Sequence, residues 1–466
     1  MTMQRITVIG LSGSIRSNHN HFKTLNQMIV KAKDRAEFTT LLKNSDYVYS
    51  NTDIALSVAL LGAKQNDADV KIISLTDLFR HRNEKLYENL TEMVTVNDIE
   101  ELDTLSIDQE HLKNISNDIN KADGIIMGTP VYFGDRSSVA NKILQLTSIQ
   151  NQLRNKAIGV VSVGAKRNGG QETAIIYTLY EVLMQGSIIT GNGPKTAQYG
   201  GTVVAGDSGM AIEDNFGMDT SYGTGKQVSQ LSKILKAGQE KSGGSPRVIF
   251  LLSMDTPEKK YNKILDEYIS RQQELTNYET VDLTDKNIYR CIACNVCPSV
   301  TVKKRKESEV SPYTCVIQTE KDYMKELRLK LIDADVIIIV GVNSNENLTY
   351  RYQAFMERTR FIRREDFELT NKVITSLLIN DVGSMHNPIF GVKVVTSFIR
   401  HNTFMTTPLQ IMMHNNTIIR EDSLDDSFPN FKQILNGRKM VQPIKVSYKA
   451  TGYANKSLDN SETKRQ

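Results

Sequence analysis

The sequence predicts an α/β protein in which a doubly wound parallel sheet is built twice, in tandem. Short apolar runs typical of buried strands alternate with amphipathic segments typical of helices, which favours parallel sheets with helices on both faces. The alternation starts at Ile6–Leu11 and restarts at Val248–Leu252, after a segment rich in Gly, Ser and Pro at 241–246. Short phrases of the first half also recur in the second half.

The first half contains four apolar runs that we interpret as buried strands. The longest helical pattern runs from Asn20 to about Lys43, and two further amphipathic segments cover Ile175–Met184 and Gln227–Gly238. The predicted strands are Ile6–Leu11, Val70–Leu75, Gly124–Gly128 and Ala157–Val163.

Three short phrases appear in both halves in the same order, each beside a predicted strand. Their order indicates an internal duplication, with domains at 1–242 and 247–445 and a polar tail at 446–466. The paired phrases are Leu75-Thr-Asp77 with Leu283-Thr-Asp285, Ala122-Asp123 with Ala334-Asp335, and Asn155-Lys156 with Asn371-Lys372.

Composition excludes several classes of protein. The chain has 466 residues, and its 57 Lys and Arg against 53 Asp and Glu leave a net charge of only +4, which does not indicate a nucleic-acid surface. No apolar run reaches the roughly 18 residues of a membrane-spanning helix. The N-terminus shows no targeting pattern, so we expect a cytoplasmic protein without a membrane partner.

The loop after the first predicted strand is rich in Ser and Gly. Ser12, Ser14, Arg16 and Asn18 lie in it, just before a helical pattern. Hydroxyl groups, free backbone N–H groups, a helix N-terminus and an arginine together suit a phosphate monoester. The alternative is an ordinary polar turn with a serine cap. The loop matches neither a Walker loop nor a G-x-G-x-x-G dinucleotide fingerprint.

With two further loops, this segment resembles the NADPH-dependent FMN reductase family, which has a flavodoxin-like fold. The other loops are Ala122-Asp-Gly-Ile-Ile-Met-Gly-Thr-Pro-Val-Tyr-Phe-Gly134 and Ser162-Val-Gly-Ala-Lys-Arg-Asn-Gly-Gly-Gln-Glu172. The resemblance implies two tandem flavodoxin-like domains, with strand order 2-1-3-4-5 and the ligand where that order reverses.

The resemblance also implies FMN in the first domain. Pro130, Val131, Tyr132 and Phe133 would edge the flavin ring, because the aromatic side chains offer it flat apolar surface. Gly164, Gly169 and Gly170 would let backbone N–H groups approach its polar edge. Core packing of the aromatic residues and an ordinary glycine turn are the alternatives.

All four cysteines lie in the second half. Cys291, Cys294 and Cys297 have the C-x₂-C-x₂-C spacing of three ligands of a [4Fe–4S] cluster, and Cys315 would be the fourth. A zinc site, free thiols and a redox pair are the alternatives. The arrangement resembles iron–sulfur flavoproteins, relatives of the FMN reductases, although the gap before Cys315 is long.

The second half lacks the flavin signals. Its first loop has no glycine and carries Asp255, which would repel a phosphate. An arginine-rich stretch predicts either a surface helix face or an anion site; its members are Arg351, Arg358, Arg360, Arg363 and Arg364.

We therefore expect an oxidoreductase that passes electrons between a reduced donor, FMN and a [4Fe–4S] cluster to a small-molecule substrate. NAD(P)H is the candidate donor, and the family resemblance makes a homo-oligomer plausible. The alternatives are an electron-transfer protein that serves a redox partner protein, and a zinc-stapled scaffold without redox activity.

Overall fold

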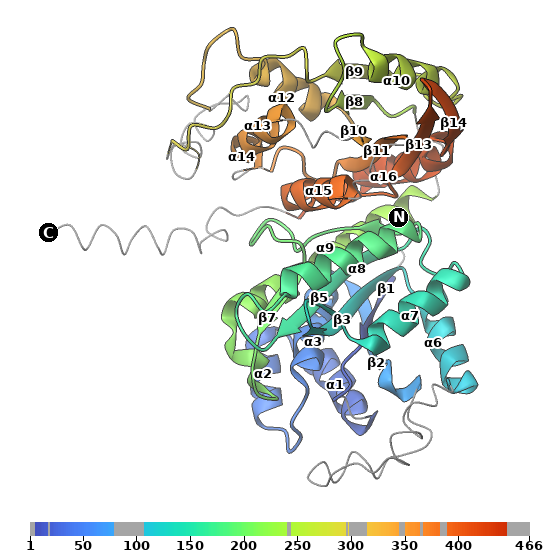
Figure 1. The fold of residues 1–466 in the computed structure, drawn as a ribbon. Coiled ribbons are helices and arrows are strands. Elements are labelled where there is room, and N and C mark those ends of the chain that lie inside the picture. The colour runs from blue at the N-terminus through green and yellow to red at the C-terminus, as the bar shows by residue number, and fades with distance from the viewer. Residues whose placement is uncertain are drawn as a thin grey trace, which may run out of the picture. The chain divides into compact units, whose positions relative to one another are not determined.

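The computed structural model describes residues 5–16, 19–78, 107–239, 244–294, 297, 315–343, 350–363, 367–382 and 389–444. They form a mixed α/β fold with mostly parallel strands (Figure 1). The chain divides into two compact units. Unit 1 comprises Met1–Gln185 and Gly200–Ser232, and unit 2 comprises Gly186–Tyr199 and Lys233–Gln466. The tail predicted at 446–466 lies outside the described residues.

In unit 1, five parallel strands lie in the order β2-β1-β3-β5-β7. Counted along the unit, and leaving aside the short β4, this order is 2-1-3-4-5. A two-residue strand, β4 (Asp135–Arg136), pairs antiparallel with the end of β3. The parallel strands are β1 (Ile6–Ser12), β2 (Ala68–Ser74), β3 (Gly124–Tyr132), β5 (Ala157–Gly164) and β7 (Gly201–Val204).

The helices of unit 1 lie on both faces of this sheet (Figure 1). Helices α3 (Asn51–Lys64) and α9 (Asn215–Gly238) pack together through two glycines, because a Cβ on Gly62 would lie 2.1 Å from Tyr222 O and one on Gly225 1.6 Å from Ala59 O. The other helices are α1 (His19–Lys31), α2 (Arg35–Lys43), α6 (Gln109–Lys121), α7 (Ser138–Ile149) and α8 (Gln171–Met184), with 3₁₀ turns η1 (Thr76–Leu78) and η2 (Met210–Glu213).

The sequence pattern missed the most buried helix of unit 1. Twelve of the fourteen residues of α3 are buried, and α3 packs on β1, β2, β3 and β5. A helix that is apolar nearly all round has no amphipathic period for a sequence pattern to detect. The helical segment expected from Asn20 to Lys43 is two helices, α1 and α2, which precede α3.

A buried hydrogen bond joins β1 to the start of α3. Ser12 Oγ donates to Asp53 Oδ1 at 2.5 Å, and both side chains are buried. The Asp53 N–H in turn donates to Ser50 Oγ, the N-cap of α3. The last residue of β1 is therefore fixed to the first turn of α3, although residues 13–49 lie between them in the sequence.

Unit 2 repeats the parallel order, as β9-β8-β10-β11-β13. Its parallel strands are β8 (Val248–Leu252), β9 (Tyr278–Asp282), β10 (Val336–Asn343), β11 (Val373–Asp381) and β13 (Leu409–His414). Strand β14 (Thr417–Glu421) pairs antiparallel with β13, and the short β12 (Phe404–Met405) lies between β11 and the antiparallel β6 (Ile188–Ile189).

The helices of unit 2 follow its strands as those of unit 1 do. They are α10 (Lys260–Ser270), α12 (Met324–Asp333), α13 (Tyr350–Arg358), α14 (Arg360–Arg363), α15 (Ile389–Phe398) and α16 (Phe428–Met440), with 3₁₀ turns η3 (Ile399–His401) and η4 (Asp425–Ser427).

The repeated phrases occupy the same structural positions in the two units. Lys156 Nζ donates to Ala122 O at 2.7 Å, and Lys372 Nζ donates to Ala334 O at 2.5 Å. Burial is the main cause that lowers the pKa of both lysines, to about 8 for Lys372. Each lysine thus satisfies a carbonyl at the C-terminus of the helix that precedes the third strand.

The other repeated residues also have matching roles. The Asp123 and Asp335 carboxylates accept from Thr7 N at 2.8 Å and Arg247 N at 3.1 Å, next to the first strand of each unit. Asn155 and Asn371 both adopt φ of 60°, in the left-handed region that asparagine tolerates. These phrases recur because each performs the same local structural task.

The Ser12–Asp53 hydrogen bond predicts a difference between two buried serines. Ser12→Ala would leave a buried carboxylate without this donor, so we expect a loss of roughly 1–3 kcal/mol in the free energy of unfolding. Ser57, also fully buried in α3, has no hydrogen-bond partner among the described residues, so Ser57→Ala is the matched control. Urea denaturation of both variants measures the difference, and equal losses would contradict the role of Asp53.

Candidate functional site

In unit 1, the loops that follow β1 and β3 contact each other at the carboxyl edge of the sheet. Gly13 N donates to Gly128 O at 2.8 Å, and Ser137 Oγ donates to Gly13 O at 2.6 Å. A Cβ at Gly13 would lie 2.9 Å from Ala140 Cβ in α7, so only glycine allows this approach. The loop after β1 therefore lies directly against the start of α7.

Two of the predicted phosphate-loop residues have different roles. The hydroxyl hydrogen of Ser12 is committed to Asp53. Ser14 Oγ accepts from Arg16 N at 3.3 Å, and its hydroxyl donates to no described residue. Arg16 is exposed, and Asn18 lies outside the described residues. Of the two serines, Ser14 is thus the one whose hydroxyl can donate to a ligand.

Besides α1, into which this loop leads, α3 also has its N-terminus at the end of β1, and the sequence reasoning did not include α3 in the site. The Ser50 hydroxyl satisfies only the N–H of Asp53. Within the described part of the chain, the backbone N–H groups of Asn51 and Thr52 have no acceptor. Free N–H groups at a helix N-terminus attract anions. The signal in the sequence was Ser50-x-x-Asp53 before the apolar run that starts at Ile54, a capping-box pattern.

Asn51 also brings the loop after β7 to this edge. Its Nδ2 donates to Asp207 O at 2.7 Å, and its Oδ1 accepts from Ala211 N at 3.0 Å. The start of α3 is therefore fixed to loops at the carboxyl ends of two strands, β1 and β7.

The aromatic segment after β3 forms a tight hairpin with β4. Tyr132 pairs with Asp135, and the two residues between them, Phe133 and Gly134, have φ of 51° and 81°. Two consecutive positive φ values are typical of a type I′ turn. A positive φ is uncommon for phenylalanine, and here the Phe133 side chain is fully exposed and Tyr132 is 43% exposed. The hairpin thus presents two aromatic side chains to solvent in a strained turn.

The glycine loop after β5 lies against this hairpin. Gly170 has φ of 95°, and a Cβ there would lie 2.7 Å from Gly134 Cα and 3.2 Å from Val131 Cγ1. Gly170 is also the N-cap of α8, and no side chain caps this helix. A Cβ on Gly134 itself, by contrast, would meet nothing within 4 Å. The hairpin is therefore held by Gly170 on one side and is open on another.

The side chain of Gln171 fixes the shape of the glycine loop. Its Nε2 donates to Lys166 O at 2.8 Å and to Val203 O at 3.3 Å, and Ser162 Oγ donates to Gln171 O at 2.8 Å. A Cβ at Gly164 would lie 2.6 Å from Gln171 Nε2, and one at Gly169 2.7 Å from Lys166 O. Gly164 and Gly169 thus shape the loop around Gln171, while Gly170 contacts the hairpin.

The charged residues of the hairpin pair with neighbouring side chains. Arg136 is buried and forms ion pairs with Glu181 of α8 and, at 3.5 Å, with Asp135. The hairpin is therefore tied to α8 by charge as well as by Gly170.

The residues of unit 1 fit a flavin mononucleotide on three counts. The Asn51 and Thr52 N–H groups and the Ser14 hydroxyl offer donors suited to a phosphate. Tyr132 and Phe133 offer apolar surface suited to a planar ring, and the glycines let loop backbone approach closely. The described sequence-predicted residues lie at the carboxyl ends of β1, β3 and β5 or on the loops that follow them, at one edge of one sheet.

In unit 2 a carboxylate occupies the corresponding helix N-terminus. Asp255, in the loop after β8, accepts from Tyr261 N at 2.8 Å and Asn262 N at 3.3 Å at the start of α10. Thr256 Oγ1 accepts from Lys260 N at 3.2 Å. Side chains of unit 2 therefore already bind the N–H groups that a phosphate would need.

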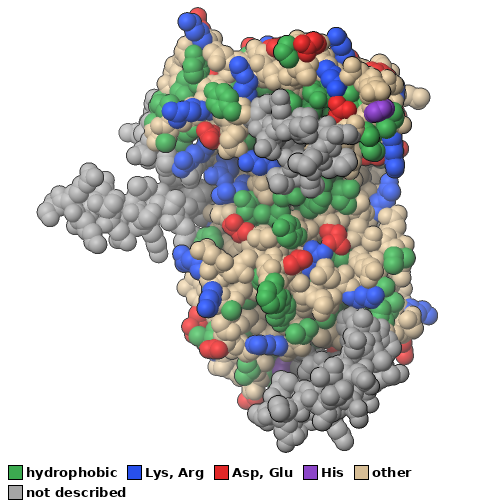
Figure 2. Space-filling model, in the orientation of Figure 1, with side chains coloured by type: hydrophobic (Ala, Val, Ile, Leu, Met, Phe, Trp, Pro, Cys, Tyr) green, Lys and Arg blue, Asp and Glu red, His purple; other side chains and the backbone are tan. Residues whose placement is uncertain are grey.

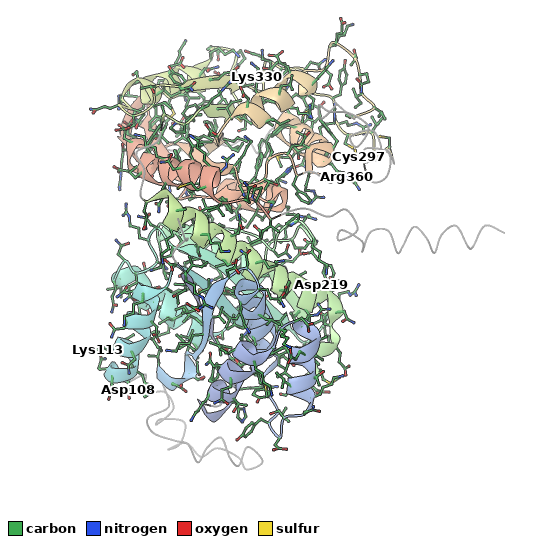
Figure 3. All side chains as sticks on the ribbon, turned by 180° about the vertical axis from the view of Figure 1, so that it is seen from behind. Asp108, Lys113, Asp219, Cys297, Lys330 and Arg360 are labelled. Atoms are coloured by element: carbon green, nitrogen blue, oxygen red, sulfur yellow. The ribbon has the colours of Figure 1, made fainter. Side chains whose placement is uncertain are left out.

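The four cysteines of unit 2 lie in the chain segments between β9 and α12. Cys291 and Cys294 are partly exposed, whereas Cys297 and Cys315 are buried, and all four are free thiols. Burial raises the pKa of the Cys297 thiol, and negative charge on Cys315, Cys294 or Cys291 raises it further. Arg360 has the opposite effect, and Figure 3 shows it beside Cys297. The three other cysteines are thus close enough to Cys297 to interact with it electrostatically.

A buried ion pair holds the two cysteine-bearing segments. Arg358 donates to Asp322 Oδ2 at 2.7 Å, with both side chains 1% exposed, and to Tyr289 O at 2.9 Å. Asp322 also accepts from Tyr289 N at 3.3 Å. Tyr289 precedes Cys291 and Asp322 follows Cys315, so this pair fixes the chain on both sides of the cysteines. Arg351, two helical turns before Arg358 in α13, donates to Lys286 O.

Two kinds of feature are absent from the described residues. Among them, no group of three or more His, Cys, Asp or Glu side chains is arranged so that it could hold a metal ion. The same part of the chain has no helix of the length and apolar content needed to span a bilayer.

Comparison with known proteins identifies the family. The model of the NADPH-dependent FMN reductases matches residues 40–187, a range that includes α3, the aromatic hairpin and the glycine loop. An iron–sulfur flavoprotein from Methanocaldococcus jannaschii is 41% identical over 121 residues, which cover 25% of this chain and 63% of that protein. The chain thus spans less than two thirds of that relative's length.

A second curated relative supports the family, whereas a solved structure does not add to the argument. An NAD(P)H dehydrogenase (quinone) from Gluconacetobacter diazotrophicus is 31% identical over 142 residues, which cover 26% of this chain and 68% of that protein. A solved flavodoxin-like WrbA-like protein from Agrobacterium tumefaciens covers 49% of this chain and 98% of its own, at 12% identity and a TM-score of 0.28, too low to support a structural argument. On the sequence matches, the chain belongs to the NADPH-dependent FMN reductase family of flavin-dependent oxidoreductases.

Proposed function

We propose that the protein is an FMN-dependent oxidoreductase that passes electrons from a reduced donor, through FMN and a [4Fe–4S] cluster, to a small-molecule substrate. FMN would bind unit 1 and the cluster unit 2. When bound, FMN supplies the ability to accept two electrons together and to release them one at a time. NAD(P)H is the donor that the family suggests.

The observation that carries the flavin proposal is the meeting of the aromatic hairpin and the glycine loop. Gly170 and Gly134 bring two loop backbones within van der Waals contact, which leaves Tyr132 and Phe133 projecting from the edge of the sheet. Pro130 and Val131 lead into this hairpin. The ring would lie along it, and backbone N–H groups at Gly169 and Gly170 would face its polar edge.

The phosphate of FMN would be bound by the start of α3 and the loop after β1. Backbone N–H groups of Asn51 and Thr52 would donate to it, joined by the Ser14 hydroxyl. Arg16 and Asn18 follow Ser14 in the same loop and are further candidates. Ser12 would act indirectly, because its hydroxyl holds Asp53 and so fixes the helix start.

The cluster proposal rests on the cysteines and on what surrounds them. Cys291, Cys294, Cys297 and Cys315 are every cysteine of the chain, and the electrostatic coupling of Cys297 to the other three supports a common site. The Asp322–Arg358 pair would hold Cys291 and Cys315 near each other before the cluster binds. Iron–sulfur flavoproteins among the relatives support this choice over zinc.

We also propose that the two units are tandem copies of one flavodoxin-like fold, divided near residues 242–247. The shared 2-1-3-4-5 order and the matching roles of Lys156 with Lys372 and Asp123 with Asp335 support this duplication. Asp255 explains why the second copy would not bind a flavin phosphate.

Gly170→Ala tests the flavin site. A methyl group would clash with Gly134, and φ of 95° is costly for alanine, so the glycine loop must move. We expect FMN affinity to fall at least about tenfold, which corresponds to roughly 1.4 kcal/mol. Quenching of flavin fluorescence during titration measures it. Gly244→Ala is the control, because a Cβ there meets nothing within 4 Å; unchanged affinity in Gly170→Ala would refute the site.

Cys294→Ala tests the division between the units. After anaerobic purification we expect the variant to lose iron and to keep FMN, by metal analysis and flavin absorption. Ile292→Ala, at an exposed neighbour in the same loop, should keep both. Equal loss of FMN in Cys294→Ala would contradict separate sites, and a colourless wild-type protein with one zinc would establish the scaffold alternative.

A further inference from the structure

Unit 2 contains a pocket that neither the flavin nor the cysteine proposal uses. Its volume is about 430 Å³, within the range of sites for small molecules. One wall is the end of α13 with the residues that follow it, and the other is α15 with the turn after it. The lining residues with charged side chains are Glu357, Arg360, Arg363, Lys393 and Arg400.

The charge of the pocket is strongly unbalanced. Among the described residues that line it, four have cationic side chains and one, Glu357, has a carboxylate. Within the described part of the chain, neither the Arg360 guanidinium nor the Lys393 ammonium forms an ion pair or a hydrogen bond. Side chains that already had acidic partners would not attract a ligand. The charges of Arg360 and Lys393 can therefore pair with a ligand.

Arg400 is held in place before any ligand arrives. Its Nε donates to Ala197 O at 3.0 Å, and its guanidinium carbon lies 5.6 Å from the centre of the Tyr199 ring, which also lines the pocket. Such fixed geometry reduces the entropy lost on binding. Arg400 is therefore a preorganised cation on the α15 side of the pocket.

The inner wall is polar but carries no further charge. His401 lies in it, 2% exposed, with Nε2 3.1 Å from Thr359 Oγ1, whose hydroxyl donates to Met356 O. Burial, with Arg363 and Arg400 nearby, lowers the pKa of His401 to about 3, so the ring is neutral near pH 7. The positive charge thus comes from the arginines and the lysine alone.

The pocket lies next to the cysteine segment. Arg360 lines it and also lies close enough to Cys297 to lower the pKa of that thiol (Figure 3). Figure 2 shows Lys and Arg side chains on the visible surface of unit 2. A molecule bound at Arg360 would therefore lie beside the cysteines.

We propose that this pocket binds a small organic anion with at least two acidic groups, either phosphates or carboxylates. One acidic group would neutralise too little of the charge, whereas two can pair with Arg360 and Lys393 while Arg400 holds one of them from the side. Guanidinium groups bind both phosphates and carboxylates in a bidentate manner. This site is separate from the proposed flavin site and does not depend on it.

Calorimetric titration of the full chain, saturated with FMN, tests the proposal with two probes. Inorganic pyrophosphate represents the phosphates and citrate the carboxylates, each at low ionic strength. We expect one or both to bind, and Arg360→Gln and Lys393→Gln each to weaken that binding at least about tenfold. Arg420→Gln and Lys325→Gln remove the same charges from exposed positions of unit 2 outside the pocket, and should change it less than about twofold.

The outcomes separate the pocket from general charge effects and from the flavin proposal. Failure of both probes to bind the wild type, or equal weakening in the control variants, would overturn the pocket. Because the informative variants lie in unit 2, their result is the same whether or not FMN binds unit 1. Should Arg360→Gln fail to fold by circular dichroism, Lys393→Gln decides alone, since the Lys393 ammonium forms no ion pair or hydrogen bond with a described residue.

Discussion

The parallel pairing of the first and third strands is the constraint on which both units depend. In unit 1 that pairing continues past the strand ends, where Gly13 N bonds to Gly128 O, and in unit 2 Ser253 N bonds to Val340 O in the same way, at 2.9 Å. Parallel strands all end at one edge, so the loops that leave them must share that edge. A ligand site built from loops far apart in the sequence follows from this geometry.

The two units differ at the start of the helix that precedes their second strand, which is α3 in unit 1 and α10 in unit 2. In unit 1 the carboxylate of Asp53 accepts from Ser12, and the N–H groups of Asn51 and Thr52 have no acceptor among the described residues. In unit 2 the carboxylate of Asp255 accepts from the N–H groups of Tyr261 and Asn262 in the first turn of α10. Asp53 thus leaves the first N–H groups of α3 to other acceptors, whereas Asp255 itself binds N–H groups of α10.

A buried ion pair joins the two described segments that carry the cysteines. Asp322 and Arg358 are both removed from solvent, and the loss of either partner would leave an unpaired buried charge at a cost of about 3–5 kcal/mol. Because Arg358 also binds Tyr289 O, the pair joins the chain before Cys291 to the chain after Cys315. Arg360, two residues later, instead faces the pocket and Cys297.

The sequence alone determined the alternation of strands and helices, the three loops of the first unit and the grouping of all cysteines in the second. These features are local, because apolar period, glycine and cysteine spacing are read within short windows. Only the tertiary structure decided that the N-terminus of α3 also lies beside the end of β1, since a helix buried nearly all round carries no amphipathic signal. It likewise decided that Arg358 is an internal ion-pair partner while Arg360 lines a pocket. Neighbouring arginines are equivalent in sequence, and only long-range contacts with Asp322 and α15 distinguish them.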